Sequence, residues 1–225
     1  MKAAIFDMDG LMLDTEPLYQ QARQNVAKEL GYELKDSFYL SLIGRNHIEI
    51  ESLIIEYFGS NFPMPHFQHL WQSRWKNQVE AFGINRKRGL TELLAWLESL
   101  KIPVAVATSS DFDYATLSLK SAGLGSEFEH IVTGDQIANG KPAPDIYLEA
   151  ADRLKVAPEN CIAFEDSEAG VMSASSAGMR VYLVPDLKVP SVATRSRAYS
   201  VADSLIEVLD HLQANYGLSS SASSV

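Results

Sequence analysis

Asp7 and Asp9 are the first residues of this sequence that could do chemistry. They follow the apolar run Ala3–Phe6 with one residue between them, and side chains at positions i and i+2 of an extended chain point to the same side. Two carboxylates in one space can act as general acid and base or hold a hard cation. Gly10 follows and permits a tight turn. A calcium loop would need an oxygen ligand and then a glycine directly after this point, and apolar residues stand there instead.

Three further polar groups follow apolar runs later in the chain. Thr108 could hydrogen-bond a phosphate oxygen, although a threonine at such a point is also a common helix cap. Lys141 lies in a loop stiffened by two prolines, which could aim its ammonium group at a fixed point, although a solvated surface lysine fits as well. Glu165 and Asp166 could bind a hard cation directly or through water, or Asp166 could cap a helix. Each motif is ambiguous alone, and together they follow the order acid, hydroxyl, lysine, acid.

The elements that must position these groups are strands that alternate with helices. Short apolar runs predict buried strands, and apolar residues at three- and four-residue spacing predict a helix before each of the last four of them. This alternation predicts an α/β fold with a doubly wound parallel sheet, in which ligands bind beyond the carboxyl ends of the strands. The predicted strands are Ala3–Phe6, Pro103–Ala107, Ile131–Val132, Cys161–Phe164 and Val181–Val184, and the predicted helices are Gly89–Leu100, Ala115–Ala122, Pro144–Leu154 and Ala169–Ala177.

Residues 15–85 break the alternation. They carry amphipathic helical patterns and no convincing strand, which predicts a helical cap domain inserted between the first two strands. Residues 1–14 and 86–218 would then form the core domain. Residues 219–225 are rich in Ser and Ala, and we expect them to be a disordered tail.

The bulk composition limits the partners of the protein. The chain has 225 residues and a net charge of −10, and such an acidic surface repels a nucleic-acid backbone. Its single cysteine, Cys161, stands in an apolar run and is expected to be a buried, reduced thiol. No signal peptide and no apolar stretch of about 20 residues is visible. A cytoplasmic enzyme with neither a nucleic-acid nor a membrane partner fits this composition, and a small phosphorylated substrate stays possible because a local cationic site can override the overall negative field.

Taken together, the motifs resemble those of the haloacid dehalogenase (HAD) superfamily. The resemblance covers nearly all of residues 1–185 and includes the position of the cap. The branch looks like the one that holds β-phosphoglucomutases, sugar phosphatases and pseudouridine-5′-phosphatases. The segments that carry it are Asp7–Thr15, Ala107–Ser110, Gly140–Asp145, Phe164–Ser167 with Gly170 and Val171, and Ala177–Met179.

The resemblance implies a Mg²⁺-dependent phosphatase that acts on a small phosphorylated metabolite, and we expect it to be a monomer or weak dimer. Asp7 would attack phosphorus and form an aspartyl-phosphate. Asp9 would be the general acid and base, because the surrounding negative charge should raise its pKa. Thr108, Ser109 and Lys141 would bind the phosphate, and Thr108 and Lys141 are also candidate catalytic residues. The Mg²⁺ ligands would be the side chains of Asp7 and Asp166 and the backbone carbonyl of Asp9, with Glu165 in or just behind that shell.

Other branches of the superfamily fit the residues less well. Dehalogenases lack the second aspartate, and a non-catalytic relative would be expected to have lost Asp7 or Asp9. A β-phosphoglucomutase-like phosphotransferase, which is the alternative function, usually has a cap histidine soon after the first motif. The run Asp14–Gln20 contains no histidine here. Substrate choice would lie in the cap, where Arg45, His47 and Lys76 are candidates. The basic run 86–88 near the second linker could attract an anionic substrate or simply be exposed.

Overall fold

The fold is built on one parallel sheet, as the sequence predicts. The computed structural model describes residues 1–43, 45 and 47–216, so the predicted tail lies outside the described residues, as does the side chain of His47. The sheet has six strands in the order β3-β2-β1-β4-β5-β6, and every neighbouring pair is parallel. The strands are β1 (Ala3–Phe6), β2 (Val104–Thr108), β3 (His130–Thr133), β4 (Cys161–Glu165), β5 (Arg180–Leu183) and β6 (Ser200–Val201).

Alternating side chains of the strands belong to two hydrophobic clusters, one on each face of the sheet. Ala4 and Phe6 belong to one cluster, whereas Ala3 and Ile5 belong to the other, as the two-residue period of a strand requires. Cys161 is a free, buried thiol on β4, as expected. The strand β6 is not predicted by the sequence pattern, because two residues are too few to show a period.

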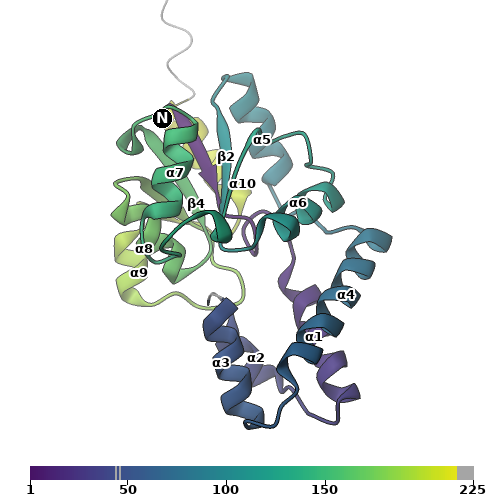
Figure 1. The fold of residues 1–225 in the computed structure, drawn as a ribbon. Helices are drawn as coiled ribbons and strands as arrows, with labels where there is room; N and C mark the ends of the chain where they lie inside the picture. The colour runs from purple at the N-terminus through teal and green to yellow at the C-terminus, as the bar shows by residue number, and fades with distance from the viewer. Residues whose placement is uncertain (44, 46, 217–225) are drawn as a thin grey trace, which may run out of the picture.

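Helices cover both faces of the sheet (Figure 1). One face packs against α7 (Asp145–Arg153) and α8 (Glu168–Ser176), which bury Ala150 and Val171 among others. The opposite cluster takes in α5 (Leu90–Ser99), α6 (Phe112–Ser121) and α10 (Leu205–Tyr216). The short helix α9 (Val192–Arg197) packs against α8. None of the described helices is both long and apolar enough to cross a lipid bilayer.

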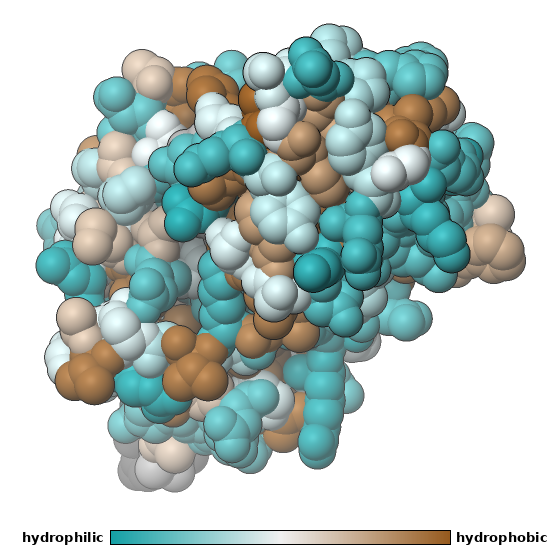
Figure 2. Space-filling model, turned by 90° about the horizontal axis from the view of Figure 1, so that it is seen from below, coloured by the Kyte–Doolittle hydropathy of each residue, from teal (hydrophilic) through white to brown (hydrophobic). Residues whose placement is uncertain are grey.

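Four helices stand between β1 and α5, at one end of the molecule (Figure 1). They are α1 (Glu16–Glu29), α2 (Asp36–Leu42), α3 (His47–Phe58) and α4 (Met64–Phe82), and they are called the cap below. All four lie within the predicted insert of residues 15–85. Seen from the cap side, the surface is largely hydrophilic, with separate hydrophobic patches (Figure 2).

The two linkers that join the cap to the sheet run side by side. The Asp14 amide donates to the Asn85 carbonyl at 2.9 Å, and the Lys87 amide donates to the Met12 carbonyl at 2.8 Å. The side chain of Lys87 pairs with Asp186 at 2.6 Å and with Asp14 at 3.4 Å. Lys87, one residue of the basic run 86–88, therefore holds the two linkers together. It is not among the residues that line the cavity next to Asp7.

Candidate active site

The candidate site lies at the carboxyl ends of the central strands. β1 pairs with β2 on one side and with β4 on the other. The strands before β4 are therefore added towards one edge of the sheet and those from β4 on towards the other edge, and ligands bind at such switch points. Asp7 directly follows β1, Thr108 ends β2, and Glu165 ends β4. A cavity lined by Asp7, Asp9, Thr108, Lys141 and Asp166 opens here towards the cap.

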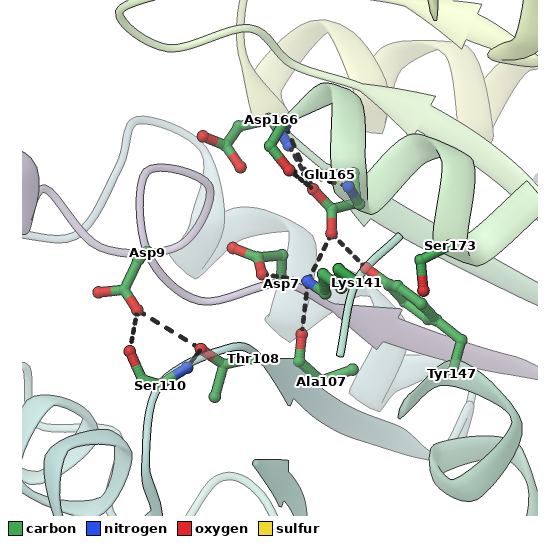
Figure 3. Close-up of polar contacts among 12 residues, drawn as sticks. Asp7, Asp9, Ala107, Thr108, Ser110, Lys141, Tyr147, Glu165, Asp166 and Ser173 are labelled. Atoms are coloured by element: carbon green, nitrogen blue, oxygen red, sulfur yellow. Dashed lines mark hydrogen bonds and ion pairs between the residues drawn. The ribbon is translucent and has the colours of Figure 1, made fainter. Parts of the chain in front are cut away.

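Lys141 connects the strand ends (Figure 3). Its Nζ donates to Asp7 Oδ1 at 2.5 Å, to Glu165 Oε1 at 2.6 Å and to the Ala107 carbonyl at 3.0 Å. The loop that carries it is held by Ser173, whose hydroxyl donates to the Ala143 carbonyl at 2.6 Å. Burial opposes the charge on Lys141, but Asp7 and Glu165 outweigh it and raise the pKa of the lysine. Lys141 is thus a fixed buried ammonium group, not a solvated surface lysine.

Glu165 is fully engaged behind the cavity. Its Oε1 also accepts from the Tyr147 hydroxyl at 2.7 Å, and its Oε2 accepts from the amides of Asp166 and Ser167 at 3.1 and 3.2 Å. A side chain at Gly170 would come within 1.8 Å of Glu165, so glycine is required there. Because both oxygens already have partners, the geometry favours a place for Glu165 behind a cation, where it positions Lys141.

The charges of this cluster suit a divalent cation. Carboxylate oxygens of Asp7, Glu165 and Asp166 lie within 4.8 Å of one another, and Lys141 supplies one compensating charge, so an excess of two negative charges remains when all are ionised. Burial raises the pKa of Asp7 to about 8, with Lys141 opposing that shift. Burial, then Asp7 and Glu165, raise the pKa of Asp166. Oxygen donors without sulfur or imidazole are the ligands that Mg²⁺ prefers.

Asp9 is held apart from this cluster by hydroxyl groups (Figure 3). The Thr15 hydroxyl donates to Asp9 Oδ1 at 2.7 Å, and the Ser110 hydroxyl donates to Asp9 Oδ2 at 2.7 Å. Thr108 lies 3.4 Å from the same Oδ2. Because a hydroxyl can donate or accept, the contacts of Thr15 and Ser110 can persist in both protonation states of Asp9. The carboxyl group is therefore held in one orientation by two hydroxyl partners.

The predicted substrate-binding residues differ in whether they line the cavity. Arg45 and the core residue Ser109 line the cavity, and Arg45 also lies 3.9 Å from Glu49. Lys76 does not line it. It is an exposed residue of α4 beside a second hollow formed with α6, so the structure does not bring Lys76 together with the other predicted substrate-binding residues.

Sequence reasoning missed several residues around the cavity. The position of Ser110 after a strand favours a helix cap, yet its hydroxyl reaches Asp9, and α6 begins only at Phe112. The aromatic stripe of the cap is typical of a helix core, yet Tyr19 and Trp71 also line the cavity, with Arg23 between them in the sequence. The spacing of Glu16, Tyr19 and Arg23 on one face of α1 was the available signal.

Comparison with known proteins identifies the family. The model of the haloacid dehalogenase-like hydrolases matches residues 4–184. The chain belongs to this family. The predicted recognition and the predicted fold are thus confirmed, and the HAD core supplies the strand ends described above.

Two curated relatives and one solved structure show how close the likeness is. A "Phosphorylated carbohydrates phosphatase" of Thermotoga maritima is 36% identical over 81% of this chain and 84% of its own length. A "Probable pseudouridine-5′-phosphatase" of Drosophila melanogaster is 36% identical over 90% of this chain and 89% of its own. The β-phosphoglucomutase of Clostridium difficile is 25% identical with a TM-score of 0.79, and the match covers 96% of this chain and 97% of that one. The predicted enzyme class, a phosphoric monoester hydrolase, agrees with the two curated relatives.

Proposed function

We propose that this HAD hydrolase is a Mg²⁺-dependent phosphatase that hydrolyses a small phosphate monoester, such as a sugar phosphate or a nucleotide-like ester, through an aspartyl-phosphate on Asp7. The observation that carries the proposal is the triad of Asp7, Lys141 and Glu165 at the base of a cavity that also holds Asp9. A nucleophile, a fixed cation and a separate acid–base group are the parts that such a reaction needs.

In this proposal Asp7 attacks the phosphorus atom of the bound ester. Lys141 is already in contact with the Asp7 carboxylate, so its ammonium group can follow the negative charge as it moves to the phosphate oxygens. Thr108 and Ser109 stand at the end of β2 on the cavity wall, where their hydroxyl and amide groups can bind those oxygens. The phosphate–oxygen bond to the organic group breaks, and the phosphoryl group stays on Asp7.

In this proposal Asp9 transfers the protons, both when the alkoxide leaves and when the aspartyl-phosphate is hydrolysed. It donates a proton to the departing alkoxide and afterwards takes one from the water that hydrolyses the aspartyl-phosphate. Thr15 and Ser110 keep its carboxyl group in one orientation throughout. This division of roles explains why two carboxylates of one strand end have such different surroundings.

The side chains of Asp7 and Asp166 would hold Mg²⁺, together with the backbone carbonyl of Asp9, and Glu165 would stand behind them. When bound, the ion supplies positive charge that lowers the repulsion between an anionic nucleophile and an anionic phosphate. Gly10 makes room for this arrangement, because a side chain there would come within 2.5 Å of Asp166 Oδ2.

Removal of Mg²⁺ should abolish phosphate release, and adding it back should restore the activity. Binding should also stabilise the fold, because the ion neutralises buried negative charge. At a hundredfold excess over its dissociation constant the gain is about 2.7 kcal/mol, which corresponds to a rise in Tm of several degrees. Released phosphate and thermal unfolding with EDTA and with Mg²⁺ measure the two effects.

Asp166→Asn is the matched variant for this experiment, since it removes one charge from the cluster without changing its size. It should weaken both the activity and the Mg²⁺-dependent rise in Tm. Full activity of the wild type in metal-free buffer, with no change in Tm when Mg²⁺ is added, would exclude the metal assignment.

The mutase alternative predicts a different product. Tyr19 stands in the region where a β-phosphoglucomutase usually has a histidine, and its ring stacks on Trp75 with the centroids 5.2 Å apart. Burial raises the pKa of Tyr19, so its hydroxyl stays neutral and cannot act as an imidazole would. With β-glucose 1-phosphate we expect inorganic phosphate or no reaction, as measured by coupled assays. Efficient formation of glucose 6-phosphate would favour the mutase alternative over the phosphatase.

A further inference from the structure

The cap wall of the cavity carries charged groups for which the reaction at Asp7 has no use. Glu16, Tyr19 and Arg23 all belong to α1 and all line the cavity. Their spacing of three and four residues places them on one face of the helix. Arg23 lies roughly 10 Å farther along the helix axis than Glu16, at 1.5 Å per residue. One helix face thus presents a carboxylate and, about two turns farther along the axis, a guanidinium group.

Glu16 is the group nearer to the chemistry. The Tyr39 hydroxyl donates to its Oε2 at 2.9 Å and fixes the carboxylate. Burial raises the pKa of Glu16, Tyr39 and Arg23 oppose that shift, and Asp9 and Asp186 add to it, so the carboxylate lies within the electrostatic reach of Asp9. The remaining lone pairs of Glu16 can accept a hydrogen bond from a bound ligand.

Arg23 is held by aromatic rings. Its guanidinium carbon lies 4.5 Å from the ring centroid of Trp71, 5.6 Å from that of Tyr19 and 6.0 Å from that of Tyr39. The helices that carry Arg23 and Trp71 pack side by side in the cap (Figure 1). A guanidinium stacked on an aromatic face keeps its N–H donors at its edge. Among the described carboxylates, none forms an ion pair with Arg23, so its charge is not neutralised by such a contact.

We infer that Arg23 determines the substrate specificity of this site by donating hydrogen bonds to hydroxyl oxygens at the far end of the organic group, while Glu16 accepts from a hydroxyl closer to the phosphate. Such a donor and acceptor pair recognises an uncharged polyhydroxylated chain of pentose or hexose length. A second anionic group is disfavoured, because it would meet the carboxylate of Glu16 on the same helix face. The inference rests on the proposed function and narrows its substrate class.

Arg23→Gln tests the inference by its selectivity among esters. For glucose 6-phosphate and ribose 5-phosphate, kcat/KM should fall about tenfold to a hundredfold, mostly through KM, as expected when one hydrogen bond to a charged group is lost. For glycerol 3-phosphate and p-nitrophenyl phosphate, which cannot reach Arg23 with a hydroxyl, the change should stay within about twofold. Arg74→Gln is the matched control, since Arg74 is a cap arginine on α4 that pairs with Glu29 and does not line the cavity.

Direct binding separates this inference from the proposed function. Calorimetry of glucose 6-phosphate with Asp7→Asn, alone and combined with Arg23→Gln, measures recognition without turnover and should show the same loss. If the wild type released no phosphate from any ester, the proposed function would fail while this measurement still tested Arg23. Arg23→Lys, which keeps the charge but loses the planar fork, is the second variant should the glutamine variant not fold, and it should show a smaller selective loss.

Three outcomes would overturn the inference. The first is an unchanged KM for sugar phosphates, and the second is an equal loss on all esters, which indicates a role in folding of the cap. The third is a wild-type preference for esters with a second anionic group that disappears in Arg23→Gln.

Discussion

Asp7→Asn should leave essentially no phosphatase activity, a loss on the order of 10⁴-fold or more, as is typical when a covalent nucleophile is removed. Asparagine has nearly the same size, so the contact with Lys141 can persist while the negative charge that attacks phosphorus is gone. Steady-state release of inorganic phosphate from several esters measures the loss. Asp152→Asn is the matched control, because Asp152 is an exposed residue of α7 outside the cavity.

Asp9→Asn should behave differently at the same strand end. It keeps the nucleophile and can keep the contacts with Thr15 and Ser110, since an amide both donates and accepts, but it cannot deliver a proton to an alkoxide. The loss should be severe on a sugar phosphate and milder on p-nitrophenyl phosphate, whose leaving group needs little protonation.

A burst of product is the most sensitive measurement for this pair. From an activated ester, Asp9→Asn should accumulate aspartyl-phosphate, because the base for its hydrolysis is missing, whereas Asp7→Asn should show no burst. Wild-type turnover by Asp7→Asn would show that another residue is the nucleophile, and the mechanism built on Asp7 would be wrong.

Lys141→Ala is expected to lower kcat/KM by about 10²- to 10³-fold, the usual effect of losing a fixed electrostatic stabiliser. It should also lower the free energy of unfolding of the metal-free protein by about 3–5 kcal/mol, because removal of one partner leaves buried charge uncompensated. Asp7 and Glu165 both lose their ammonium partner in this variant. Phosphate release and urea denaturation measure the two effects.

Two further variants sharpen that result. Lys28→Ala removes an exposed lysine of α1 and should change neither quantity appreciably. Glu165→Gln should weaken activity through Lys141, so its effect should be much smaller in the Lys141→Ala background than alone. A Lys141→Ala enzyme within about twofold of the wild type would mean that the lysine holds the strand ends together and takes no part in the reaction.

The sequence alone determined the fold and the polar groups that follow its central strands. Apolar runs followed at once by Asp7, Thr108 or Glu165 revealed both the strands and their polar ends, because the period of a strand and the polarity after it are written in neighbouring residues. Parallel strands present their carboxyl ends at one edge, so the sequence pattern is sufficient to place these groups together. The loop of Lys141 could be assigned to the same place only by resemblance to the family.

Only the tertiary structure decided which contacts each group makes. Asp9 meets Ser110, which lies 101 positions along the chain, and Lys141 meets Glu165 through an order of strands that the sequence does not display. The packing of the cap also decided that Arg23 lies on the cavity wall and that Lys76 does not. Helical periodicity shows that residues share a face, but which neighbour that face meets depends on how distant elements pack, and this is a property of the whole chain.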